Sequence, residues 1–164
     1  MPTELLERIR SEIRRSFQGP AWHGPALLEA LADLSAVEAL RHPIEGAHSA
    51  AELLLHCLAW TEEVTRRLSG GEAALPERGD WPPVPELDEA AWLSFRHTLE
   101  AAAEALDQGV ASFPSERLHE RVGGPVQDCP LGSGVPFEVM LHGLAQHNAY
   151  HAGQIALLRR ALRS

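Results

Sequence analysis

Apolar residues return every three or four positions in four long stretches of the chain, which is the spacing of a helix with one buried face. Glycine and proline gather between these stretches, where they interrupt helices. The stretches run from about Thr3 to Phe17, from Ser49 to Leu68, from Asp88 to Phe113 and from Phe137 to Leu162. The pattern therefore predicts an all-α protein, a four-helix bundle that occupies residues 1–164 as a single domain.

Short-range signals indicate where three of these helices begin. Ser49 is followed three residues later by Glu52, which is the spacing of a capping box. Thr3 and Asp88 are residues of the type that caps a helix N-terminus, so we expect them to cap the first and third helices.

Two long connections stand out between the helices. Residues 18–48 contain two Gly-Pro breaks, so only short helices, such as one from Ala26 to Leu31, fit within this first connection. Residues 121–136, before the last helix, are rich in glycine and proline. They predict a short hairpin or no regular structure at all.

Composition narrows the classes of function. Alanine and leucine outnumber valine and isoleucine, which favours helix over strand. The formal net charge is -9, and an acidic surface repels a polyanion, so we expect no nucleic-acid partner. All 14 basic residues are arginine, which excludes Schiff-base chemistry on a lysine and a P-loop lysine.

The same sequence indicates the cellular compartment in which the protein is expected. No stretch approaches the ~20 apolar residues of a membrane span, and the N-terminal helix is charged, unlike a secretory leader. We therefore expect a cytoplasmic protein with no membrane partner. In that reducing compartment Cys57 and Cys129 are expected to be free thiols.

Two histidines interrupt the apolar stripe of the last helix. Counting three residues on from Leu144, and four residues back from Ile155, leads to His147 and His151. Residues four apart lie one turn apart on the same face, so both imidazoles can bind one ion. Imidazole nitrogen suits zinc, nickel, copper and iron(II) better than calcium or magnesium. The pair therefore predicts a divalent transition-metal site.

A third ligand should come from a neighbouring helix, and His56 is the candidate. It lies mid-helix at the edge of an apolar face, between Leu53 and Trp60. Three histidine ligands leave a fourth position open, as in catalytic sites. The alternative is a surface pair or a satisfied core pair, with His56 as a core or boundary residue. Against it, burying two unpaired histidines costs a few kcal/mol, which an ion would offset.

Other polar residues have weaker claims on this site. Gln154 shares the face of His147 and His151, and Glu63 lies seven residues after His56, so both are candidates for contacts to a ligand or to substrate. The alternative for both is an ordinary solvated or inter-helix polar residue. Structural or solvent roles are expected for the remaining histidines: His142, which should face away from the pair, and His23, His42, His48, His97 and His119.

Two segments carry a resemblance to a known family. SAAELLLHCLAW at residues 49–60 and HGLAQHNAYHAGQIALLRRAL at residues 142–162 are similar to segments of the DinB-like superfamily of four-helix-bundle metal proteins. The resemblance implies an up-down-down-up bundle, with long loops between helices 1 and 2 and between helices 3 and 4. It also implies zinc or nickel bound by His56, His147, His151 and water, and frequent homodimers.

The resemblance leaves several functions in competition. Some relatives are thiol S-transferases that use bacillithiol, mycothiol or glutathione, one group is a mycothiol-dependent maleylpyruvate isomerase, and many have no assigned activity. The first hypothesis is therefore a metal-dependent transferase that joins a low-molecular-weight thiol to a small electrophilic substrate. A non-catalytic metal-binding stress-response protein is the second hypothesis. A metal-dependent hydrolase is the third, although the sequence offers no clear general base.

The expectation of a homodimer has a second basis in the sequence. Trp22 and Trp81 both fall in loops, where a monomer would leave large apolar side chains partly exposed to water. A second copy of the chain would cover them.

Overall fold

The computed structural model describes residues 2–124 and 131–163, and over these residues the chain is helical, without a named strand. The prediction of an all-α protein is therefore confirmed. An isolated antiparallel bridge joins Arg121 to Pro136. The long helices are α1 (Pro2–Phe17), α4 (Ala50–Leu68), α5 (Glu89–Ser112) and α6 (Phe137–Leu162), and the short ones are α2 (Leu27–Leu31), α3 (Ala36–Leu40) and the 3-10 helix η1 (Ser115–His119).

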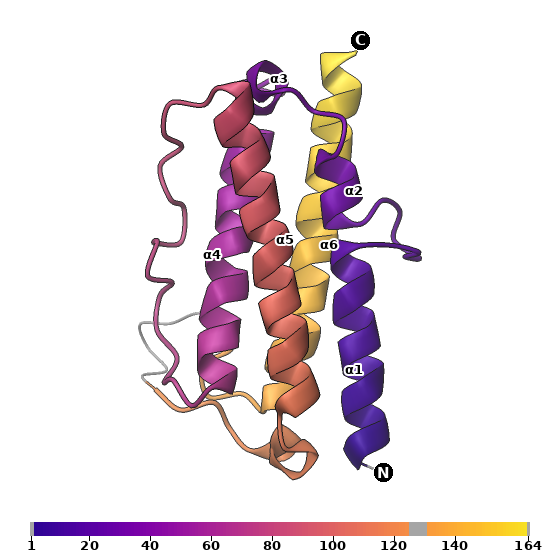
Figure 1. Cartoon of the computed structure of the whole chain (residues 1–164), viewed down its shortest axis with the longest axis vertical. Helices are drawn as coiled ribbons and strands as arrows, with labels where there is room; N and C mark the ends of the chain where they lie inside the picture. Colours follow the sequence, from indigo (N-terminus) through magenta and orange to yellow (C-terminus); the bar gives the residue numbers. More distant parts are fainter. Residues whose placement is uncertain (1, 125–130, 164) are drawn as a thin grey trace.

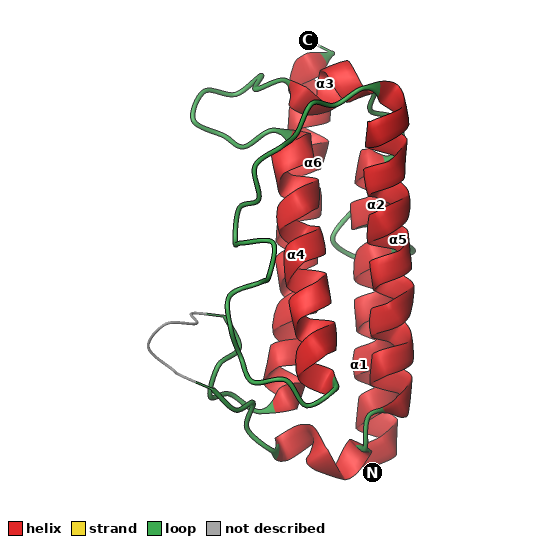
Figure 2. Ribbon diagram, turned by 60° about the vertical axis from the view of Figure 1, so that its left-hand side comes forward, coloured by secondary structure: helices red, strands yellow, loops and turns green. Residues whose placement is uncertain are grey.

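The long helices pack side by side, and each contacts two others around the bundle: α1 lies against α5 and α6, and α4 lies against the same two helices. In Figure 1, α1 and α6 rise from the end of the molecule where the N-terminus lies, whereas α4 and α5 descend towards it. Because α4 and α5 run in the same direction, the connection between them must return along the whole bundle. Residues 69–88 do so on the outside, next to α4 (Figure 2).

The predicted caps explain where the helices begin. The Ser49 side chain accepts a hydrogen bond from the Glu52 amide, and the Glu52 carboxylate accepts one from the Ser49 amide, so the capping box at α4 is confirmed. Asp88 accepts a hydrogen bond from the Ala91 amide and caps α5, also as predicted. The expected cap at Thr3 is wrong, because α1 already begins at Pro2, whose fixed φ suits the first helical position.

The first long connection holds two short helices, as the sequence allows. The helix expected near Ala26 to Leu31 is α2, found at Leu27–Leu31, and α3 follows it at once. Ser35 begins α3 through a second capping box with Glu38, a local signal in the printed sequence. None of the helices described here combines the length and the apolar character needed to cross a membrane.

The interior of the bundle is apolar along most of its length. All four long helices contribute fully or nearly fully buried side chains, such as Ile9 from α1, Leu54 from α4, Leu99 from α5 and Ile155 from α6. Few polar residues are buried, and three of these, His56, Asn148 and His151, lie on the facing helices α4 and α6. The buried polar residues of the core are therefore concentrated on these two helices, and Asn148 among them faces α1.

Candidate metal centre

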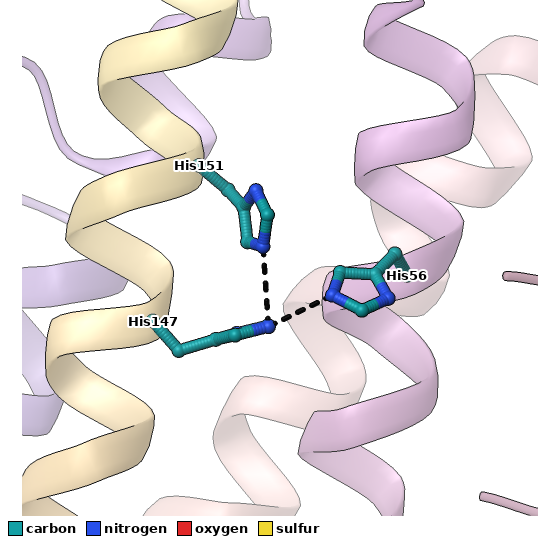
Figure 3. A group of neighbouring side chains, drawn as sticks. All are labelled: His56, His147 and His151. Carbon is teal, nitrogen blue, oxygen red and sulfur yellow. Dashed lines mark hydrogen bonds between the residues drawn. The ribbon is translucent and has the colours of Figure 1, made fainter. Parts of the chain in front are cut away.

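Three imidazoles from two helices converge on one point (Figure 3). His56 extends from α4, and His147 and His151 extend from consecutive turns of α6. The Nε2 atom of His147 lies 2.9 Å from Nε2 of His56 and 3.2 Å from Nε2 of His151. One ligand atom from each residue lies within 4.8 Å of the other two, an arrangement suited to a metal ion. The fold thus brings together the three histidines that the sequence singled out.

Hydrogen-bond acceptors next to two of these rings determine which ring nitrogen carries the proton. Nδ1 of His56 lies 2.5 Å from the backbone carbonyl oxygen of Asp80, which only accepts, so this nitrogen carries the proton and donates it. Nδ1 of His151 lies 2.6 Å from the side-chain oxygen Oε1 of Gln154 and donates in the same way. The assignment follows from the hydrogen-bond network. Both Nε2 atoms are therefore left with a lone pair that faces the common point.

Burial keeps the histidines neutral. Loss of water around the ring is the main cause that lowers the pKa of His56, His147 and His151 below the ordinary histidine value. For His147 the pKa falls to about 3, because repulsion from His151 and His56 adds to burial, while the Asn148 side chain opposes the shift. Neutral imidazoles are the form that binds metal.

The donor set and its spacing fit a transition-metal ion. A tetrahedral ion with Zn–N bonds of about 2.0 to 2.1 Å holds its ligand nitrogens about 3.3 Å apart, close to the 2.9 and 3.2 Å that separate Nε2 of His147 from the other two Nε2 atoms. Only one proton can lie among three nitrogens that face each other so closely, whereas a cation can bind all three lone pairs. Nitrogen ligands favour zinc, nickel, copper or iron(II) over calcium and magnesium. The residues present therefore fit such an ion.

The connection between α4 and α5 completes one wall of the site. The Trp81 ring stacks on the imidazole of His56 at 3.9 Å and 6°, and its other face stacks on His48 at 3.7 Å and 10°. The Asp80 carboxylate accepts a hydrogen bond of 2.7 Å from the indole N–H of Trp60. Sequence reasoning missed these roles of Asp80, Trp81 and His48, because no spacing rule links a loop residue to a helix that it crosses.

The buried side-chain amide of Asn148 lies next to His147. Among the described residues, His147 Nδ1 and Asn148 Oδ1 are both buried without a hydrogen-bond partner. The Asn148 amide nitrogen donates to the Ser16 hydroxyl over 3.2 Å, and that hydroxyl donates to the Ile13 carbonyl over 2.7 Å. Asn148 is thereby anchored to α1, with its free oxygen available to the histidine that precedes it.

The two residues that the sequence proposed as further contacts of the site, Gln154 and Glu63, lie in different places in the structure. Gln154 lies beside the site, where it accepts from His151 and donates to the Tyr150 hydroxyl over 3.2 Å. Glu63 is two turns further along α4, and its carboxylate accepts hydrogen bonds from Arg66, Arg67 and the Ala74 amide. A role for Glu63 beside the histidines stays a prediction, without a contact to them among the described residues.

The remaining sequence candidates lie away from the three rings. His142 has its Nδ1 atom 2.6 Å from the Glu12 carboxylate, so it belongs to the contact between α6 and α1. Cys57 is a free thiol, fully buried, and burial raises its pKa. Cys129, the other expected thiol, lies outside the described residues.

Comparison with protein families matches residues 21–155 to the DinB superfamily. The matched range contains His56, His147 and His151, together with Asp80 and Trp81. Comparisons with curated proteins and with solved structures gave no match.

Proposed function

This chain belongs to the DinB superfamily, and we propose that it binds one divalent transition-metal ion, zinc or nickel, through His56, His147 and His151. The observation that carries the proposal is the convergence of three Nε2 atoms, two of which are left unprotonated by hydrogen bonds at the other ring nitrogen. Asp80, Gln154 and Trp81 hold these rings in place, as the neighbours of metal-binding histidines commonly do.

We further propose that the protein is a metal-dependent thiol S-transferase acting on small electrophiles. An ion held by three neutral ligands keeps its full positive charge, which lowers the pKa of a thiol from about 8.5. In the reaction, the thiol sulfur forms a bond to an electrophilic carbon, the leaving group departs with its electron pair, and the thiol proton passes to water. Bacillithiol, mycothiol and glutathione are the candidate thiols.

Within the described part of the chain, no cysteine offers a reactive thiol at the site. Cys57 is fully buried in the core, and its raised pKa keeps the thiol protonated near neutral pH. The three histidines are neutral and are engaged with one another and with their neighbours. A thiol that reacts at this site would therefore come from a second, small molecule.

Two other functions remain as alternatives. A metal-binding stress-response protein without catalysis would need the same three ligands. Hydrolysis is less supported, because it requires a general base close to the converging Nε2 atoms. The nearest described carboxylate, that of Asp80, lies instead on the Nδ1 side of His56, 3.4 Å from that nitrogen, and it already accepts a hydrogen bond from Trp60. A cytoplasmic location and the lack of nucleic-acid and membrane partners stay predictions from composition.

A conjugation assay tests the transferase. Zinc-loaded and nickel-loaded proteins are incubated with each of the three thiols and 1-chloro-2,4-dinitrobenzene, and the coloured conjugate is followed by absorbance. We expect one thiol to be conjugated, activity to disappear with a chelator or in His56→Ala, and activity to persist in Cys57→Ala. If loaded protein conjugates none of these thiols, the non-catalytic alternative becomes the better explanation. If chelated protein is equally active, the metal-dependent mechanism is wrong.

A further inference from the structure

A pocket of about 210 Å³ lies between α4 and α6, next to the candidate metal centre. Its α4 wall includes Trp60 and Val64, and its α6 wall includes Val139, Met140 and Leu144. The ring of His147 also lines it, so the pocket shares one residue with the three converging histidines.

The pocket has one charged residue in its wall, Arg67, whose guanidinium is already paired with other protein groups. Arg67 donates to the Glu63 carboxylate over 2.7 Å, and the two side chains are 0% and 2% exposed. The Arg67 guanidinium also donates to the carbonyl oxygens of Leu131 and Ala74 and contacts the Met140 sulfur. Its guanidinium also lies 5.6 Å from the centre of the Trp60 ring. The pocket therefore offers mostly apolar walls to a ligand, and its one charged side chain, Arg67, is already bound to other protein groups.

The volume limits what can enter. An apolar cavity of about 150 Å³ inside a protein is large enough to bind benzene. At about 210 Å³, this pocket has room for a single ring that carries a short substituent, or for an aliphatic chain of similar bulk.

We propose that this pocket binds the uncharged, apolar part of the electrophilic substrate and so holds it beside His147. The inference rests on the proposed thiol transfer and adds the class of acceptor: a small aromatic or aliphatic electrophile without a net charge. Burial of its apolar surface against Val64, Met140 and Leu144 supplies the binding free energy.

Two glycines of α6 provide a matched pair of variants. Gly143 lines the pocket, whereas Gly153 does not, and a Cβ atom added to either residue meets no atom within 4 Å. Gly143→Leu should therefore fill the pocket, and Gly153→Leu should leave it open. Leucine is a better helix former than glycine by roughly 1 kcal/mol, so both variants should keep the fold.

Binding is measured first with an inert probe, so that the result does not depend on catalysis. Zinc-loaded protein is titrated with propylbenzene, and the NMR signals of the Met140 methyl group and the Trp60 indole N–H are followed. We expect saturable shifts in the wild type and in Gly153→Leu, and at least about a tenfold loss of affinity in Gly143→Leu.

Conjugation is then compared for two electrophiles that both release chloride. With 1-chloro-2,4-dinitrobenzene, Gly143→Leu should raise KM severalfold, whereas chloroacetamide, which is too small to fill the pocket, should give a KM close to that of the wild type. Unsaturable binding of propylbenzene to the wild type, or equal affinity in the two glycine variants, overturns the pocket assignment whatever the activity. Saturable binding without conjugation of any electrophile supports the pocket and overturns the thiol transfer.

Discussion

The position of one proton on each imidazole decides what the three histidines can bind. Asp80 and Gln154 accept the Nδ1 protons of His56 and His151, which leaves both Nε2 lone pairs facing the Nε2 atom of His147. This division of the two ring nitrogens is the one that metal-binding histidines need. The metal content of single-residue variants should therefore distinguish the histidines proposed to bind the ion from a histidine elsewhere on the same helix.

Removal of one ligand should remove most of the metal. We expect His147→Ala and His151→Ala to lose the bound ion, because each deletes one of only three protein ligands. His142→Ala is the matched control on the same helix, since its contact is with Glu12, and it should retain the ion. Elemental analysis of untagged protein gives the stoichiometry. Equal metal content in the wild type and both ligand variants would show that the three histidines are not the site.

Asn148 should tune the affinity of the site through His147. When His147 binds an ion through Nε2, its Nδ1 must carry a proton, and the unpaired Oδ1 atom of Asn148 is the acceptor that the adjacent residue offers. We expect Asn148→Ala to weaken metal binding by about 10- to 100-fold, the usual cost of losing such a partner. Competition with a chromogenic chelator measures the change. Ser16→Ala, which removes only the anchor of Asn148, should have a smaller effect.

At the scale of elements, ion pairs connect segments that the chain order keeps apart. Glu63 and Arg67 lie on α4, and together they bind Ala74 in the following connection and the Leu131 carbonyl before α6. Asp107 of α5 accepts two hydrogen bonds from Arg10 of α1. These pairs hold the connections and helices in place around the site. The contribution of each pair to the free energy of unfolding can be measured separately.

The buried pair should contribute much more to stability than the exposed pair that Glu62, also on α4, makes with Arg78. Glu63→Gln leaves the Arg67 guanidinium buried without its counter-charge, which costs about 3 to 5 kcal/mol of the free energy of unfolding. Glu62→Gln is the control, because the Glu62–Arg78 pair has side chains 39% and 43% exposed and should contribute at most about 1 kcal/mol. Urea unfolding measures both. Equal losses would contradict the assignment of a structural role to Glu63.

The pair between α1 and α5 predicts a dependence on pH. The hydrogen bonds from Arg10 lower the pKa of Asp107 in the folded protein. Ionised Asp107 therefore stabilises the fold above its unfolded pKa of about 3.9, and this stabilisation is lost as the pH falls through the lower folded value. The difference in unfolding free energy between the wild type and Asp107→Asn should be about 1 kcal/mol at pH 7 and should vanish in strong acid. A constant difference across this range would contradict it.

At the scale of the whole molecule, exposed apolar residues bear on assembly. Trp22 is 101% exposed, whereas Trp81, 40% exposed, is sandwiched between two histidines of its own chain. Trp22 also lines an open groove of about 780 Å³ together with residues of α1 and α6, such as Arg15 and Gln146. Of the two tryptophans on which the expected homodimer was based, Trp22 is therefore the one left without cover in the single chain.

The homodimer remains a prediction that solution measurements can decide. Light scattering at micromolar concentration should give about twice the chain mass of 17.9 kDa. Trp22→Ser should shift the protein towards the monomer if this surface is covered by a second copy. Leu93→Ser is a control at another exposed apolar position, 47% exposed on α5, and should leave the mass unchanged. A wild type with the mass of one chain would exclude the dimer.

The sequence by itself determined the elements. The bounds of α4, α5 and α6 follow from the capping residues Ser49 and Asp88, from the proline after Phe113 and from helical periodicity, which all act within a few residues. The pairing of His147 with His151 follows from the same period. Local rules suffice here because one helical turn fixes how residues three or four apart are placed.

Only the tertiary structure decided what surrounds these histidines. The contact between His56 and His147 spans 91 positions, and the one between His56 and Asp80 spans 24. The Trp81 stack, the anchoring of Asn148 to Ser16 and the pocket between α4 and α6 likewise depend on how the helices and the 69–88 connection pack. Periodicity places a side chain on a face, but packing alone determines which residue from elsewhere in the chain lies opposite it.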